Sequence, residues 1–146
     1  MSATPLLKCV ACSNESLISV LDLGVQPLAN SFKLNRGDVQ EEYPLAINHC
    51  SECFHVQLTH SVDPKLMFDD YLYVSGTSKT MHRHCEDFAS IVKQKLPEAK
   101  SILDIGCNDG TQLDYFKSIG FNTFGIDPAK NLHGLSNKNH FVWCVS

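Results

Sequence analysis

The stretch Ser101-Ile102-Leu103-Asp104-Ile105-Gly106-Cys107-Asn108-Asp109-Gly110 decides the fold of the C-terminal part of this chain. Its first five residues predict a buried strand, and its two glycines frame a turn that leads into a helix over residues 111–119. An acidic residue, Asp127, follows Gly106 by 21 positions, at the end of a second expected strand over residues 122–126. A strand, a glycine-containing turn, a helix and a later acidic residue are typical of a nucleotide-type cofactor site.

Strands and helices alternate through residues 98–146. We expect Leu113, Phe116 and Ile119 to face the core from the helix and Gly120 to end it. A short helical turn over residues 132–135 and a third strand over residues 140–145 follow. This alternation predicts a parallel sheet with crossover helices, so the fold class is α/β and residues 98–146 form the first part of a Rossmann-like domain.

The region upstream, residues 1–74, is organised by two Cys-x-x-Cys pairs, Cys9 with Cys12 and Cys50 with Cys53. The spacing lets two thiolates of each pair reach one ion, and four thiolates complete the tetrahedron that zinc favours. The pairs are separated by 37 residues, so we expect the intervening loop to have structure of its own. The sequence predicts a small domain with a structural Zn²⁺ site, in which the neighbouring histidines are not needed as ligands.

Three segments around the second pair have simpler interpretations. Residues 21–32 carry Pro and Gly, which predict turns, and their apolar side chains are expected to pack beneath the metal site. Residues 54–60 alternate with period two, which predicts a half-buried strand. Residues 75–97 form a connecting segment and a helix over residues 79–96, capped by Ser78 or Thr77. Spacing along this helix predicts that His84 faces packed structure.

Composition narrows the class of protein. Among 146 residues, 43% are hydrophobic and 19% are charged, which is typical of a globular chain. The formal net charge is −4 and no run of Lys or Arg occurs, so we expect no nucleic-acid partner. The first eight residues lack the features of a signal peptide, and no segment is long enough to span a membrane. We therefore expect a cytoplasmic protein without a membrane partner.

The glycine spacing distinguishes between nucleotide ligands. A dinucleotide fingerprint needs glycine where this chain has Asn108 and Thr111, and the Gly-Lys-Ser/Thr of a phosphate-binding loop is absent. The pattern Asp-x-Gly-x-x-x-Gly, from Asp104 through Gly106 to Gly110, matches that of methyltransferases that use S-adenosyl-L-methionine (SAM). Asp104 would then face the amino-acid end of SAM, and Asp127 would accept hydrogen bonds from the ribose hydroxyls. Asn108 is among the few residues that tolerate a positive φ.

The joint order of motifs resembles the zinc-binding sugar C-methyltransferases, which are similar to the 3-C-methyltransferases of deoxysugars. The resemblance runs from Cys9 to about residue 131 and rests on the cysteine pairs, residues 24–30, 43–45 and 71–78, and the turn at residues 104–110. It implies that the zinc domain covers the active site. It also implies that Tyr73, Ser75 and His84 line the cofactor or substrate cleft.

The family methylates carbon next to the keto group of a nucleotide-linked sugar, after a base removes a proton. Its proposed tyrosine, glutamate and histidine lie downstream of the cofactor motif, beyond Ser146. The resemblance therefore implies an N-terminal portion, truncated before its catalytic half, and names no catalytic residue. Phe54 is a smaller departure, since the family usually has glycine there.

Two other functions stay open at this point. The chain could be a non-catalytic zinc-ribbon module that binds a protein or sugar nucleotide, or an oxidoreductase that uses NAD. A three-stranded parallel sheet also has exposed edges, which predicts possible self-association.

Overall fold

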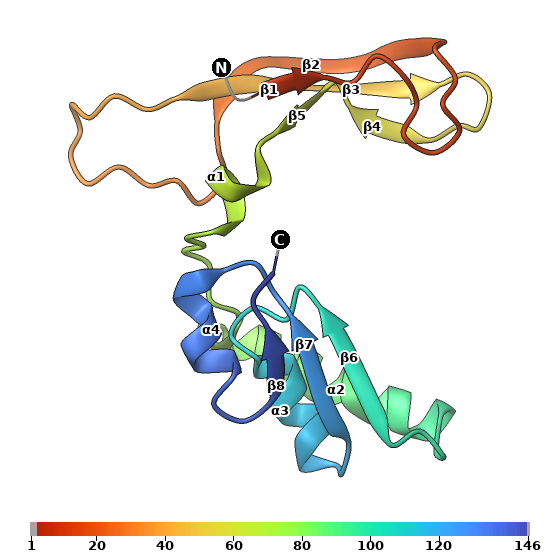
Figure 1. Ribbon diagram of the computed structural model, residues 1–146, viewed down its shortest axis with the longest axis vertical. Helices are drawn as coiled ribbons and strands as arrows, with labels where there is room; N and C mark the ends of the chain where they lie inside the picture. The colour runs from red at the N-terminus through yellow and green to blue at the C-terminus, as the bar shows by residue number, and fades with distance from the viewer. Residues whose placement is uncertain (1–2, 146) are drawn as a thin grey trace. The chain divides into compact units, whose positions relative to one another are not determined.

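The structure is a computed structural model that describes residues 3–145 (Figure 1). The chain divides into two compact units between Met67 and Phe68. The first unit is built of antiparallel strands, and the second contains a three-stranded parallel sheet with helices. The predicted α/β fold class is confirmed. Among the described residues, no helix combines the length and the apolar character that crossing a membrane requires.

Unit 1 contains two antiparallel sheets. Strand β1 (Ala3–Pro5) pairs with β5 (His60–Val62). The second sheet has the order β2-β3-β4, formed by β2 (Leu17–Pro27), β3 (Glu42–Cys50) and β4 (Val56–Leu58). The pairing of β2 with β3 starts next to the metal-site cysteines, because Leu17 lies opposite Cys50.

The turns predicted over residues 21–32 are largely wrong, because β2 continues through most of that segment. The glycine that suggested a turn, Gly24, instead occupies a β-bulge with φ +70°, where its N–H donates to the Asp22 carboxylate at 2.8 Å. A turn forms only after the strand, where Asn30 has φ +62°. The side chains of Leu21, Leu23 and Val25, which were expected to pack beneath the metal site, are exposed.

The strand predicted over residues 54–60 is divided into β4 and β5 by Thr59. Its buried side chain is a polar one, Gln57, with 6% of its surface exposed, whereas Val56 and Leu58 are exposed. The strand is half-buried as predicted, and its buried face carries the polar side chain of Gln57.

Unit 2 carries the parallel sheet, whose order is β6-β7-β8. Helix α1 (Pro64–Phe68) runs into this unit and is followed by the 3₁₀ turn η1 (Ser75–Thr77) and α2 (Lys79–Lys95). The alternating part comprises β6 (Ser101–Ile105), α3 (Thr111–Ser118), β7 (Asn122–Ile126), α4 (Lys130–Ser136) and β8 (Phe141–Trp143). The predicted bounds of the first two strands are confirmed, α4 is longer than predicted and β8 is shorter.

The core of unit 2 lies between α2, α3 and one face of the sheet. Ala89, Phe116 and Phe121 form its centre, and the two phenylalanine rings meet edge to face with centroids 5.4 Å apart. Ser78 caps α2 as predicted, accepting from the Met81 N–H at 3.3 Å. Ile119, expected in the core, is 36% exposed because α3 ends at Ser118.

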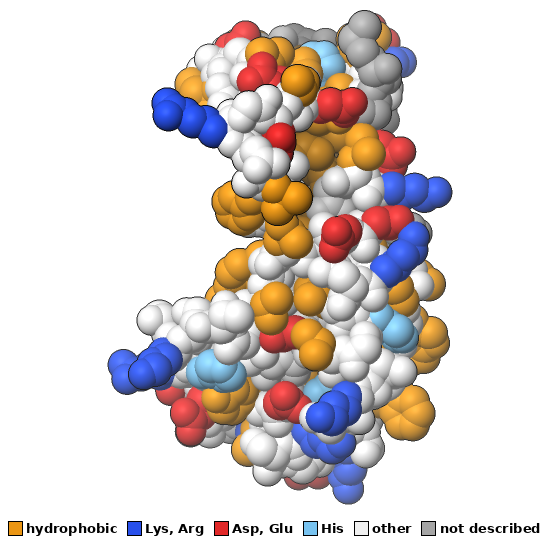
Figure 2. All heavy atoms as spheres, turned by 90° about the vertical axis from the view of Figure 1, so that its left-hand side faces the viewer, with side chains coloured by type: hydrophobic (Ala, Val, Ile, Leu, Met, Phe, Trp, Pro, Cys, Tyr) orange, Lys and Arg blue, Asp and Glu red, His pale blue; other side chains and the backbone are white. Residues whose placement is uncertain are grey.

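The opposite face of this sheet is apolar and exposed in the described residues. Leu103, Phe124 and Phe141 lie in one row across the three strands, and Ile105, Ile126 and Trp143 lie in the next. Ile105 is 78% exposed and Phe141 is 73% exposed. In Figure 1, α2 and α3 lie behind the sheet, and Figure 2 shows apolar side chains at the surface of both units, with basic and acidic groups interspersed. Parallel sheets are normally covered on both faces.

Candidate metal and cofactor sites

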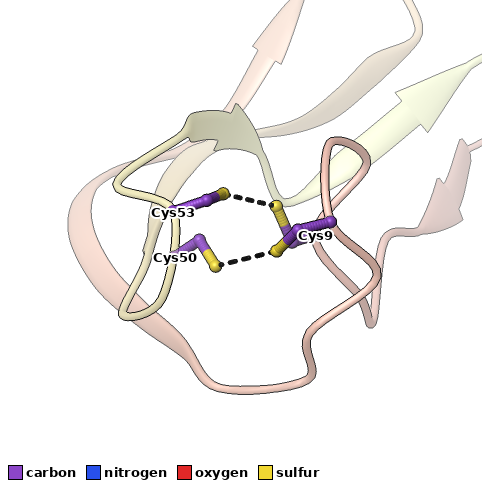
Figure 3. Close-up of side chains that lie close together, drawn as sticks. Cys9, Cys50 and Cys53 are labelled. Atoms are coloured by element: carbon purple, nitrogen blue, oxygen red, sulfur yellow. Dashed lines mark hydrogen bonds between the residues drawn. The ribbon is translucent and has the colours of Figure 1, made fainter.

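Four sulfur atoms come together in unit 1. The Sγ atoms of Cys9, Cys12, Cys50 and Cys53 all lie within 4.8 Å of one another. Cys9 lies 3.5 Å from Cys53, and Cys12 lies 3.7 Å from Cys50, so the two pairs face each other (Figure 3). A tetrahedron with Zn–S bonds of 2.3 Å has edges of about 3.8 Å. The cluster therefore has the size and donor set that Zn²⁺ requires.

The two cysteine turns share one backbone geometry. The Cys9 carbonyl accepts from the Ser13 N–H at 2.8 Å, and the Cys50 carbonyl accepts from the Phe54 N–H at 3.1 Å. Ser13 has φ +64° and Phe54 has φ +61°, a conformation that glycine adopts most easily. This explains why glycine suits the position of Phe54 in the resembled family. The Phe54 ring contacts His49, with centroids 5.6 Å apart.

The thiols differ in their readiness to lose a proton. Burial raises the pKa of Cys9, but hydrogen bonds from the backbone of Cys12 and Ala11, together with those from the Cys53 and Cys12 thiols, lower that pKa to about 6. At Cys12 a backbone hydrogen bond from Asn14 acts to lower the pKa, yet interaction with Cys53 and burial raise it to about 12. Once one thiol has lost its proton, its negative charge therefore disfavours ionisation of the neighbouring thiols. A bound dication would stabilise all four as thiolates.

A buried amide supports the first cysteine turn. Gln57 Oε1 accepts from the Val10 N–H at 2.9 Å, and its Nε2 donates to the Lys8 carbonyl at 3.0 Å. These two bonds join β4 to the residues on either side of Cys9. This role could not be predicted from the sequence, because an isolated glutamine in an alternating strand indicates a solvent-facing residue.

The glycine turn of unit 2 follows β6 directly. Gly106 and Gly110 have φ values of +87° and +86°, and Asn108 has φ +52°, which confirms the expectation that it takes a positive φ. A Cβ placed on Gly106 would meet no atom within 4 Å, so this face of the turn is open. A Cβ on Gly110 would lie 3.1 Å from both His140 and Ser136, so Gly110 allows α4 to approach.

A cavity of about 340 Å³ lies beside this turn. Five of the eight predicted cofactor residues line it: Ser75, His84, Asp104, Gly106 and Asn108. Five further residues share the lining and were not predicted for this site: Met81, Cys85, Phe88, Cys107 and Gln112. The apolar stripe at helical spacing over residues 81–88 could have indicated three of them, Met81, Cys85 and Phe88. His84 itself is exposed, and its ring stacks on Phe88 with centroids 6.2 Å apart.

The other three predicted residues lie around the turn and do not line the cavity. Tyr73 accepts through its carbonyl from Asn108 Nδ2 at 3.0 Å. Asp127 uses both carboxylate oxygens to hold backbone, with the Asn108 N–H at 2.7 Å and the Ala129 N–H at 2.8 Å. Gly110 begins α3 as its N-cap.

Two carboxylates shape the electrostatics of the turn. Burial raises the pKa of Asp104, and the nearby charge of Asp127 raises it further. Such a pair favours a cationic ligand, which would compensate their repulsion. Burial also raises the pKa of Cys107 to about 12, so this thiol is neutral and is not an activated nucleophile.

Two features define the class of protein. One is a parallel sheet with a glycine turn and a cavity at the end of a strand, and the other is a four-cysteine metal site in the same chain. Two family models match the chain. One, described as "Putative zinc binding domain", covers residues 9–68, and the other, described as "Methyltransferase domain", covers residues 78–144. The first part of the chain is therefore similar to a zinc-binding domain, and the second part is similar to a methyltransferase domain.

Individual relatives of the chain are also methyltransferases. C-methyltransferase NovU of Streptomyces niveus is 27% identical over 137 residues, covering 91% of this chain and 33% of NovU. A dTDP-3-amino-3,4,6-trideoxy-alpha-D-glucopyranose N,N-dimethyltransferase of Streptomyces venezuelae is 30% identical over 73 residues, covering 50% of this chain and 30% of that enzyme. The chain thus spans about a third of the length of these relatives.

Among solved structures, Streptomyces venezuelae DesVI aligns with a TM-score of 0.39 and 27% identity, covering 46% of this chain and 30% of DesVI. SAM-bound CalS10, an amino pentose methyltransferase from Micromonospora echinaspora, aligns with a TM-score of 0.41 and 23% identity, covering 50% and 35%.

Proposed function

We propose that unit 2 binds SAM and that the protein takes part in methylating a nucleotide-linked keto-deoxysugar at carbon. One observation carries the cofactor assignment: five residues predicted from sequence converge on a single cavity at the end of β6. Carbon is favoured over nitrogen because the match to NovU extends through both units, whereas the match to the N,N-dimethyltransferase covers half of the chain.

The residues of the turn have distinct proposed tasks. Asp104 would hold the ammonium group at the amino-acid end of the cofactor, since its carboxylate lines the cavity and is repelled by Asp127. Asp127 lies at the end of β7 and would accept from the ribose hydroxyls with its remaining lone pairs. Gly106 would leave room for the ligand, because nothing fills the space beside it. The cofactor, once bound, would supply an electrophilic methyl group.

Unit 1 is proposed to hold one structural Zn²⁺ through its four cysteines. Its site has no position left for water or substrate, as in closed zinc sites. We also propose a cytoplasmic location, because four of the seven cysteines are placed to bind a metal ion and a reducing compartment keeps such thiols available.

The test is calorimetric binding of S-adenosylhomocysteine to the zinc-loaded chain. We expect saturable binding, and we expect Asp104→Asn to weaken it about tenfold or more, because a hydrogen bond between two charged groups is lost. Asp87→Asn is the matched control, since Asp87 lies exposed on α2 and outside the cavity. Affinity should also fall as Asp104 is protonated at acidic pH.

The outcomes separate the alternatives. A chain that holds one zinc per molecule but binds no S-adenosylhomocysteine would refute the methyltransferase proposal and favour a zinc-ribbon module. Tight NADH binding without S-adenosylhomocysteine binding would favour an oxidoreductase.

A further inference from the structure

The segment of residues 73–77, which we call the strap, is hydrogen-bonded to the glycine turn by the side chains of Asn108 and Asp109. Asn108 Oδ1 accepts from the Ser75 N–H at 3.0 Å, and Asn108 Nδ2 donates to the Tyr73 carbonyl at 3.0 Å. The neighbouring Asp109 accepts from the Gly76 N–H at 2.9 Å. Consecutive residues of the turn therefore bind consecutive parts of the strap.

The Asp109 carboxylate accepts hydrogen bonds both from the strap and from Thr111, the first residue of helix α3. Its Oδ2 also accepts from the Thr111 hydroxyl at 2.9 Å, and its Oδ1 accepts from the Thr111 N–H at 3.1 Å. The contact with the strap is so close that a Cβ on Gly76 would lie 2.6 Å from Thr111 Oγ1 and 2.7 Å from Asp109 Oδ2. Glycine is required at this position to let the strap reach the turn.

The far side of the same peptide is held as well. His82 Nε2 lies 2.9 Å from the Gly76 carbonyl, and its Nδ1 lies 3.1 Å from the Tyr115 hydroxyl. Since a carbonyl only accepts, Nε2 carries the proton there. Both polar groups of Gly76 are thus fixed.

Ser75, in the middle of the strap, lines the cavity together with Asp104. Asp109 does not line the cavity. We propose that Asp109 is a positioning residue, which holds the strap so that Ser75 meets the amino-acid end of the bound cofactor. This rests on the proposed function, and it assigns to Asp109 an effect on ligand affinity that acts through Gly76.

The test compares two ligands on the zinc-loaded chain by calorimetry. S-adenosylhomocysteine carries the amino-acid end, and 5′-methylthioadenosine lacks it. We expect Asp109→Asn to weaken S-adenosylhomocysteine about tenfold, because an amide leaves a donor facing a donor, and to leave 5′-methylthioadenosine within about twofold. Amide hydrogen exchange should rise over residues 73–77 and stay unchanged in β6 and β7.

Two further variants separate positioning from helix capping. Gly76→Ala displaces the strap and leaves Asp109 intact, so it should reproduce the selective loss. Thr111→Val removes a hydroxyl bond of Asp109 but keeps the Gly76 contact, so it should retain affinity even if the melting temperature falls. Because Asp109→Asn and Gly76→Ala act on one contact, the double variant should lose little more than either alone.

The inference is overturned if both Asp109→Asn and Gly76→Ala bind S-adenosylhomocysteine as the wild type does. It is also overturned if they weaken both ligands equally and Thr111→Val does the same, since that would indicate general destabilisation. A wild-type chain that binds neither ligand overturns the proposed function and this inference together, a result distinct from the previous two.

Discussion

Replacing Gln57 by leucine tests whether a polar contact supports the metal site. The side chain is buried and makes two hydrogen bonds, one to the Val10 N–H and one to the Lys8 carbonyl. Leucine has a similar size, so the substitution removes both bonds without leaving a large cavity. A net loss of about 1 kcal/mol per hydrogen bond gives about 2 kcal/mol for Gln57→Leu.

This free energy should appear as zinc affinity, because metal binding and folding of a small site are coupled. A change of about 2 kcal/mol corresponds to about 30-fold weaker binding. The assay is competition for Zn²⁺ with a chromophoric chelator of known affinity, combined with urea unfolding of the zinc-loaded chain.

Gln26→Leu is the matched control, since the Gln26 side chain is exposed and donates to the nearby Leu23 carbonyl, far along the chain from the cysteine turns. Its effect should stay within about 0.5 kcal/mol. If Gln57→Leu binds zinc as tightly as the wild type and unfolds at the same urea concentration, the amide does not support the site and the reasoning is refuted.

Four other predictions concern stability and assembly. Burial lowers the pKa of His140, so the unfolded state binds more protons than the folded state at acidic pH. The free energy of unfolding should therefore be constant above about pH 6.5 and fall below it, which urea unfolding between pH 5 and 8 would measure. The substitution His140→Asn should reduce this pH dependence. Ser13→Gly should raise the unfolding free energy by about 0.5–1 kcal/mol, because glycine adopts the positive φ without strain, and an unchanged or lower value would contradict this. Removing zinc with a chelator, or the substitution Cys12→Ser, should abolish the β-sheet circular dichroism of unit 1, whereas Cys144→Ser, outside the cluster, should not. Sedimentation at rising concentration should detect self-association through the uncovered sheet, and Phe141→Lys should reduce it; a monomer at all concentrations would exclude it.

The parts predicted correctly from sequence are those that local residues determine. The strand at residues 101–105, the capping of α2 by Ser78 and the positive φ of Asn108 depend on neighbours within a few positions. The cysteine pairs could be recognised because each pair forms its own turn. Binding of one ion by all four thiols requires the two turns to lie close together.

The parts that were missed depend on distant partners. Gln57 is buried because the backbone at Val10, 47 positions away, needs an acceptor. The strap is held by Asn108 and Asp109, each 33 positions from its partner. Gly24 suggested a turn, yet pairing with β3 turned it into a bulge within a long strand. No local pattern carries that information.

The four-cysteine cluster has one more consequence, which concerns the unfolded chain. Among the described residues of unit 1, the buried hydrophobic side chains are Cys9, Tyr43 and Cys50, so two of the three are metal-site cysteines. Cys12 and Cys50 are 38 positions apart, so an ion bound by both closes a long loop. By the chain-entropy relation for cross-links, a loop of this length is worth about 4 kcal/mol. The bound ion would therefore stabilise unit 1 as a cross-link does, in place of an apolar core. The fold of unit 1 would then depend on metal binding.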